Sequence, residues 1–222
     1  MEPVLVFLHG WAFDAALFDR LAPLLPGADP VVADFGYFGE VVPPVIPRTD
    51  APAVIPRTAP PVVAIAHSFG ALWLLHEKPF AFDALVAING FPRFTEAADF
   101  RPAVSSRVVD RMIQRFDLEP QAVLRDFRLR CGADGALPGE PRLERLRAGL
   151  VGLRDWDGRA GLDDVPVLAL AGSADPIVPP AMSEAAFAAP EMHPSAGHLL
   201  PLSDPEWCAG HIRGFLGRIA ES

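Results

Sequence analysis

The chain has 222 residues, a formal net charge of −9 and 50% hydrophobic residues. This length predicts one α/β-sized domain with one large insertion, and so apolar a chain is not disordered. The acidic balance argues against nucleic acid or an anionic membrane as a partner. No apolar run reaches the roughly 18 residues of a membrane span. The first residues indicate a strand rather than a signal peptide, and only two cysteines are present. We therefore expect a cytoplasmic monomer.

Continuous apolar runs predict strands that are buried on both faces. These runs are residues 4–8, 30–33, 62–66, 84–88 and 165–171. Helical spacing of apolar residues lies between several of them, at residues 15–25, 69–77, 181–188 and 204–219. Strands that alternate with helices predict right-handed βαβ units and a parallel sheet. In such sheets ligands bind beyond the carboxyl ends of the strands, so functional residues are expected there.

Two segments interrupt this alternation. Residues 45–61 are rich in proline, which predicts an extended surface loop that serves as a linker rather than as a PxxP-like docking site. Residues 91–159 have helical periodicity at 104–116, 120–130 and 141–154 but no strand pattern, which indicates a helical insertion. We call residues 91–159 the lid segment and expect residues 1–90 and 160–222 to form the core. The lid segment holds 13 of the 18 arginines and a net charge of +2, against −11 elsewhere.

Residues 66–70 (Ala-His-Ser-Phe-Gly) follow an apolar strand and begin a helical run. This is the context of a nucleophile elbow, G-x-S-x-G, with Ala66 at the first glycine position. The sharp strand-to-helix turn exposes the serine hydroxyl above the sheet, and the helix N-terminus favours developing negative charge. We interpret Ser68 as a nucleophile, although a buried serine in such a turn would give the same pentapeptide.

A serine nucleophile needs a base, and the base needs an acid that orients it. For this elbow the chain order is serine, then an acid, then histidine. Asp175 follows the strand at 165–171, and His198 lies in a small-residue loop before the last helix. Taken singly, Asp175 could cap a turn and His198 could lie on the surface. Together with Ser68 they predict a catalytic triad.

An oxyanion in the reaction must be held by backbone N–H groups. One is the amide of Phe69, which follows the nucleophile, and the other is expected from Trp11 in the loop after the first strand. The sequence contains no H-E-x-x-H, C-x-x-C or G-x-G-x-x-G pattern, so we expect neither a metal nor a nucleotide cofactor.

These motifs resemble the α/β-hydrolase superfamily over nearly the whole chain. They are residues 9–11, 34–39, 66–70, 172–179 and 197–198. The resemblance implies an α/β-hydrolase fold with a mostly parallel sheet and a helical lid insertion. Because the N-terminal antiparallel strands common in the superfamily are absent, we expect a shorter sheet.

Within the superfamily, residues 9–11, 89–94 and 120–131 look most like the pimeloyl-(acyl-carrier protein) methyl ester esterases of biotin biosynthesis. In that family the enzyme hydrolyses the methyl ester of a pimeloyl chain on acyl-carrier protein, and lid arginines hold the acidic carrier. The resemblance implies that Trp11 and Phe69 contact the oxyanion and the substrate. It also implies an acyl channel lined by consecutive lid residues: Phe127, Arg128, Leu129, Arg130 and Cys131.

The lid arginines repeat at helical spacing. Arg125 and Arg128 are three residues apart, as are Arg142 and Arg145, and residues at this spacing share a helix face. Such faces would steer and orient an acidic carrier. Alternatively, the arginines pair with neighbouring acidic residues on a solvated surface.

We therefore expect a serine carboxylesterase that acts on a carrier-bound pimeloyl-type methyl ester. The alternatives are a small-molecule esterase, lactonase or thioesterase with the same triad, and a catalytically slow binding protein of the same fold.

Overall fold

The computed structural model describes residues 2–26, 30–44, 60–163 and 165–221. Most of the proline-rich segment, residues 45–59, lies outside this set, so the expected linker is not described. Within the described residues, no helix is long and apolar enough to cross a membrane.

The core is a six-stranded parallel sheet in the order β2-β1-β3-β4-β5-β6. The strands are β1 (Val4–Leu8), β2 (Val31–Ala33), β3 (Val62–His67), β4 (Ala84–Ile88), β5 (Val167–Gly172) and β6 (Glu191–His193). Five of them match the expected apolar runs to within two residues at each end. The sixth, β6, has only three residues and two of these are polar, so its sequence carries no apolar run.

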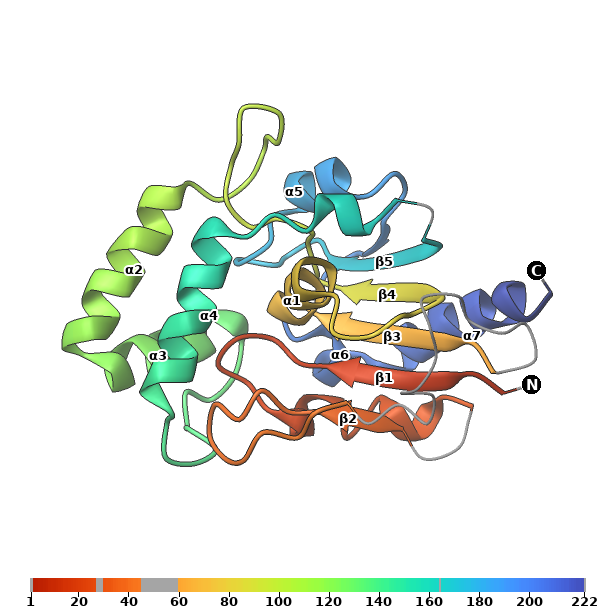
Figure 1. Ribbon diagram of the computed structural model, residues 1–222, viewed down its shortest axis with the longest axis horizontal. Helices are drawn as coiled ribbons and strands as arrows, with labels where there is room; N and C mark the ends of the chain where they lie inside the picture. The colour runs from red at the N-terminus through yellow and green to blue at the C-terminus, as the bar shows by residue number, and fades with distance from the viewer. Residues whose placement is uncertain (1, 27–29, 45–59, 164, 222) are drawn as a thin grey trace.

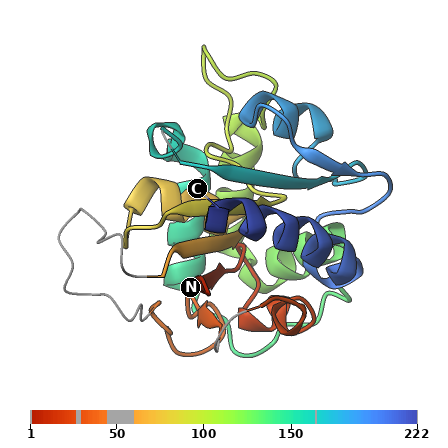
Figure 2. The same ribbon diagram turned by 90° about the vertical axis from the view of Figure 1, so that its right-hand side faces the viewer.

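Helices cover both faces of the sheet (Figures 1 and 2). One face packs against α1 (Phe69–Glu77), and the other against α7 (Pro205–Glu221) and the 3-10 helix η1 (Ala15–Phe18). Alternate residues of β3 point to opposite faces, because side chains alternate along a strand. Val63 and Ile65 join the cluster on the α7 side, while Ala64 and Ala66 join that on the α1 side.

The expected continuous helix over residues 15–25 is wrong. This segment forms two short 3-10 helices, η1 and η2 (Ala22–Leu24). Pro23 lies within η2 and explains the difference, since proline lacks the backbone N–H and clashes with the carbonyl four residues earlier in an α-helix.

The lid segment forms a helical layer at the carboxyl ends of the strands (Figure 1). It contains α2 (Ser106–Leu118), α3 (Pro120–Cys131) and α4 (Leu143–Asp155), followed by the 3-10 helix η3 (Arg159–Gly161). The remaining helices, α5 (Pro180–Ala186) and α6 (Leu200–Ser203), flank the loops that follow β5 and β6. Buried lid side chains such as Ile113, Leu124 and Leu150 belong to the main hydrophobic cluster, so the lid layer and the sheet share one core.

Candidate active site

The elbow at Ser68 joins β3 directly to α1. Ser68 has φ 52° and ψ −121°, a conformation that side chains rarely adopt, and its amide donates to the carbonyl of Ile88 at 3.1 Å. Gly70 follows because a Cβ there would lie against the carbonyl oxygen of Leu8 and 2.7 Å from that of His9. Backbone strain of this kind costs about 1–3 kcal/mol, and here it raises the Ser68 hydroxyl above the strand ends.

The structure brings Ser68, His198 and Asp175 together from three different strand ends. His198 Nε2 lies 3.0 Å from Ser68 Oγ, and His198 Nδ1 lies 2.8 Å from Asp175 Oδ2. All three side chains are buried. With the Nδ1 proton donated to the carboxylate, Nε2 carries the lone pair and can accept the Ser68 proton.

The Asp175 carboxylate is held by several donors. Its Oδ1 accepts the amides of Ile177 at 2.7 Å and Val178 at 2.9 Å, and its Oδ2 accepts His198. Burial alone would raise the pKa of this carboxyl, but His198 and the two amides together hold the pKa below its usual value. The acid of the triad is therefore ionised at neutral pH.

Two amides next to the triad are free to hold an oxyanion. The Trp11 amide donates to no backbone acceptor within the described residues, and Phe69 is the first residue of α1, where helix amides lack a partner in the preceding turn. The Trp11 side chain is fully buried, and its Nε1 donates to the carbonyl of Leu146 in α4 at 2.8 Å. We call residues 9–14, between β1 and η1, the oxyanion loop. The bond from Trp11 ties this loop to the lid segment.

An apolar pocket of about 390 Å³ lies over Ser68. Its walls come from the oxyanion loop, the lid segment and the loop after Asp175, and they include Trp11, Ser68, Phe91, Phe94, Val104, Ser105, Val108, Val109, Met112, Phe127, Arg130, Leu153, Pro176 and Ile177. Val108 is 50% exposed, so the pocket reaches solvent along α2. A mostly apolar wall suits an acyl chain whose reacting carbonyl sits at Ser68.

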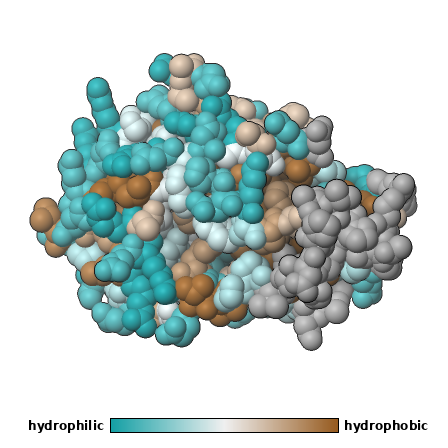
Figure 3. All heavy atoms as spheres, in the orientation of Figure 1, coloured by the Kyte–Doolittle hydropathy of each residue, from teal (hydrophilic) through white to brown (hydrophobic). Residues whose placement is uncertain are grey.

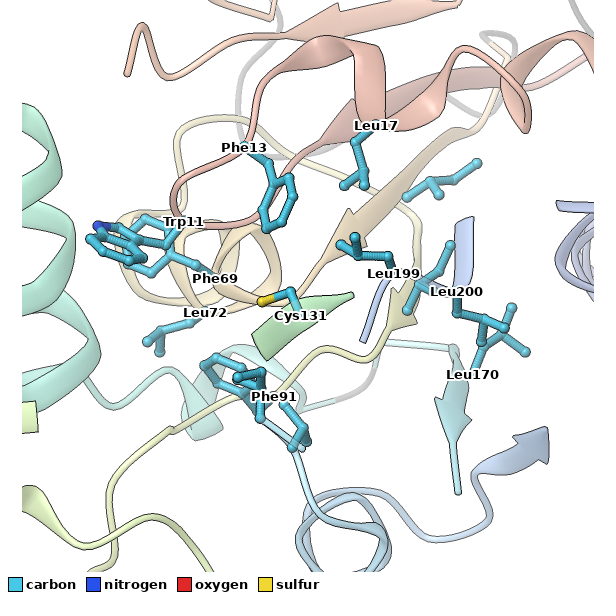
Figure 4. Packing of buried hydrophobic residues seen from close by; sticks show 14 of the residues in the cluster. Trp11, Phe13, Leu17, Phe69, Leu72, Phe91, Cys131, Leu170, Leu199 and Leu200 are labelled. Atoms are coloured by element: carbon cyan, nitrogen blue, oxygen red, sulfur yellow. The ribbon is translucent and has the colours of Figure 1, made fainter. Parts of the chain in front are cut away.

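Of the five consecutive lid residues expected to line the acyl channel, only two line the pocket in the structure. Phe127 and Arg130 line the pocket, and Phe127 packs edge-on against Trp11 with the ring centroids 4.8 Å apart. Leu129 is exposed, and Cys131 lies in the buried cluster with Trp11, Phe69 and Phe91 (Figure 4). One helix cannot turn five successive side chains to one side, so a continuous lining of these residues is wrong.

The two arginine pairs expected to share helix faces differ from that expectation in the structure. Arg125 is exposed, but Arg128 is buried, with its guanidinium donating to the carbonyl of Ala12 at 2.8 Å and lying over the Phe13 ring. Arg128 is therefore a core contact between α3 and the oxyanion loop and cannot dock a carrier. Arg142 and Arg145 are exposed, although Arg142 immediately precedes α4 rather than lying within it.

Two polar residues that the sequence analysis did not assign to the site contact the triad. His67 is fully buried, and its Nε2 lies 2.8 Å from the carbonyl oxygen of His198. Burial, with repulsion from His198, lowers the pKa of His67 to about 3, so it stays neutral. Asn89 follows β4 and donates to Asp175 Oδ2 at 2.7 Å. In the sequence, the only feature that points to His67 or Asn89 is its position at the end of a predicted strand.

The described residues contain no group of three or more His, Cys, Asp or Glu side chains that could hold a metal ion. The contacts among Ser68, His198 and Asp175 match those of a serine hydrolase on a parallel sheet. A model of the alpha/beta hydrolase family matches residues 5–211, and the chain belongs to this family.

Similar curated proteins narrow the resemblance. A pimeloyl-(acyl-carrier protein) methyl ester esterase of Aromatoleum aromaticum is 30% identical, over 94% of this chain and 96% of its own. The enzyme of the same name from Neisseria meningitidis is 30% identical over 80% of this chain and 77% of its own. The resemblance expected from the sequence is confirmed.

Among solved structures, an esterase from Exiguobacterium antarcticum has the same fold. It superposes with a TM-score of 0.75 over 98% of this chain and 92% of its own, at 19% identity. The expected α/β-hydrolase fold is thereby confirmed.

Proposed function

We propose that this chain is a serine carboxylesterase that hydrolyses the methyl ester of a pimeloyl-type chain on acyl-carrier protein. The observation that carries the proposal is the Ser68, His198 and Asp175 arrangement, with successive contacts of 3.0 and 2.8 Å, beneath an apolar pocket. We infer the substrate from the similar proteins of Aromatoleum aromaticum and Neisseria meningitidis, which are pimeloyl-(acyl-carrier protein) methyl ester esterases.

The reaction follows from the positions of these groups. Ser68 Oγ attacks the ester carbonyl carbon while its proton passes to His198 Nε2, and the Trp11 and Phe69 amides stabilise the resulting oxyanion. The intermediate collapses, His198 returns the proton to the methoxy oxygen, and methanol leaves. Water then attacks the acyl-enzyme with His198 as base, which releases the carboxylate and restores Ser68.

The pocket favours a neutral chain end at Ser68. Apart from Ser68, its polar and charged lining consists of Ser105 and Arg130, and the Arg130 guanidinium already donates to the carbonyl of Pro176 at 3.0 Å. A methyl ester can enter such an apolar space at a lower desolvation cost than a free carboxylate. The rest of the chain would leave along α2, where Val108 is half exposed.

The carrier would dock beside this opening. Arg107 and Arg111 flank Val108 on α2, are exposed, and have no acidic partner within 4.0 Å in the described part of the chain. Other lid arginines differ, since Arg147 and Arg154 are held by carboxylates at 2.7–2.8 Å. We therefore place the docking face for an acidic carrier at Arg107 and Arg111.

Arg125 on α3 is likewise exposed and unpaired in the described residues. Arg142 and Arg145 contact Glu40 and the carbonyl of Gly36, in the loop after β2. In Figure 3 the lid surface is largely hydrophilic with separate apolar patches.

The test compares kcat/KM for a carrier-bound pimeloyl methyl ester and for a small free methyl ester. Arg107→Glu/Arg111→Glu should lower the value for the carrier-bound ester at least tenfold and leave the free ester within about twofold. Arg142→Glu/Arg145→Glu, with the same change in charge away from the opening, is the matched control. An unchanged kcat/KM for the carrier-bound ester, or turnover of only the free ester by the wild type, would favour the small-molecule esterase. Equal losses on both substrates would show that the substitutions damage the lid fold.

A further inference from the structure

Asn89 lies at the carboxyl end of β4 with φ 46°, in the left-handed region, and only 1% of its surface is exposed. Its Nδ2 donates two hydrogen bonds, to Asp175 Oδ2 at 2.7 Å and to the carbonyl of Gly197 at 2.8 Å. Both partners are oxygen acceptors, so only the NH₂ group of the amide can face them. The single nitrogen thus joins the loop of the acid to the loop of the base.

Asn89 completes the set of donors around the carboxylate. Each oxygen of Asp175 accepts two hydrogen bonds, with the Ile177 and Val178 amides on Oδ1 and the His198 and Asn89 side chains on Oδ2. A carboxylate with four donors cannot rotate without breaking several bonds at once. The bond from Asn89 therefore fixes the oxygen that orients His198.

The second bond acts on the base directly. Gly197 precedes His198, so a donor on the Gly197 carbonyl restrains the backbone from which the imidazole projects. Asparagine meets both demands because it carries two hydrogens on one nitrogen and tolerates the left-handed backbone, whereas a serine has a single hydroxyl proton. The Oδ1 atom of Asn89 has no partner in the described residues, so the amide contributes only its NH₂ group.

We propose that Asn89 is a positioning residue for the triad, holding the Asp175 carboxylate and the His198 loop in register. This inference rests on the esterase function proposed above. It predicts that loss of the amide lowers kcat and leaves substrate binding nearly unchanged, because Asn89 does not line the pocket.

The test uses two variants that tolerate the backbone conformation. Asn89→Gly removes the donor and is expected to lower kcat for p-nitrophenyl acetate about 10- to 100-fold, with KM within about twofold. Asn89→Asp keeps the size of the side chain but replaces the NH₂ group with a carboxyl oxygen that faces Asp175 Oδ2 and the Gly197 carbonyl. It is expected to lower kcat as well, with KM within about twofold.

The matched control is Ser173→Ala. The Ser173 hydroxyl donates to the carbonyl of Pro194 and so also joins the loops after β5 and β6, but it does not contact the carboxylate. Ser173→Ala should keep kcat within about twofold. A wild-type kcat in Asn89→Gly would overturn the proposal, as would an equal loss in Ser173→Ala.

The same variants separate this inference from the proposed function. If the wild type hydrolyses p-nitrophenyl acetate but not the carrier-bound ester, the substrate assignment fails and the Asn89 comparison still stands. If no ester is turned over, the NMR resonance of the His198 Nδ1 proton decides. Broadening or loss of that resonance in Asn89→Gly supports the proposal, and an unchanged resonance contradicts it.

Discussion

Gly172→Ala should damage catalysis without touching a triad residue. Gly172 ends β5, and its backbone lies outside the left-handed region, so alanine is conformationally allowed there. However, a Cβ would lie 2.7 Å from the carbonyl oxygen of Gly197 and closer still to that of Ala196. Both atoms belong to the backbone just before His198, so the obstruction cannot be relieved by a side-chain rotation.

The size of the effect follows from the required movement. The Gly197 oxygen must retreat by about 0.3 Å to reach a tolerable 3.0 Å, and the Ala196 oxygen must move further. The Ala196 oxygen also accepts the Ala174 amide at 3.0 Å, so its retreat strains the link to the Asp175 loop. Displacements approaching 1 Å cost up to about 100-fold, and we expect kcat to fall about 10- to 100-fold. Overpacking of this kind should also cost about 1–3 kcal/mol of stability.

The assay is kcat on p-nitrophenyl acetate, with urea unfolding measured in parallel. Gly217→Ala is the control, because that glycine is exposed in α7 and an added Cβ meets nothing within 4 Å. It should keep the wild-type kcat and gain up to about 1 kcal/mol from helix propensity. A Gly172→Ala variant with wild-type kcat would refute the reasoning that this close approach sets the position of His198.

Two further predictions concern strain and pH. Ser68→Gly and Ser68→Ala should both be inactive. The glycine variant should be about 1 kcal/mol more stable in urea unfolding, because glycine adopts a positive φ without strain. Equal stabilities of the two variants would argue against backbone strain at residue 68. The pKa of His67 is about 3 in the folded state, below the usual 6.5, so its contribution to stability is present above pH 6.5 and is lost as the pH falls. The free energy of unfolding of the wild type should fall by about 2 kcal/mol between pH 7 and 5. In His67→Gln, which keeps a donor toward the His198 carbonyl, it should fall correspondingly less. Equal decreases in the two proteins would show that His67 is not the group responsible.

The arrangement of Ser68, His198 and Asp175 could be predicted from the sequence because each residue lies in a local motif at a strand end. A buried apolar strand, small residues two positions before and after Ser68 (Ala66 and Gly70) and a helical run after it are together typical of a nucleophile elbow. Asp175 and His198 follow in the expected order, and a parallel sheet gathers its strand ends at one edge. The apolar runs likewise define five of the six strands.

The remainder depends on packing that spacing does not reveal. Arg125 and Arg128 are close on one helix, yet only the seating of α3 against Ala12 and Phe13 shows that Arg128 is buried. Asn89 precedes a glycine, a pair that is typical of a turn, and nothing local indicates that its amide reaches a carboxylate 86 positions later. Long-range contacts of this kind require the folded arrangement.

The most direct test of the account is hydrolysis of a pimeloyl methyl ester carried on acyl-carrier protein, followed by mass spectrometry of the intact carrier. The wild-type protein is predicted to convert the ester to the free acid with release of methanol. Ser68→Ala is predicted to lower the rate by about 10³-fold or more, since a triad does not function without its nucleophile. A Ser68→Ala variant that still converts the ester at a rate close to that of the wild type would contradict the central claim.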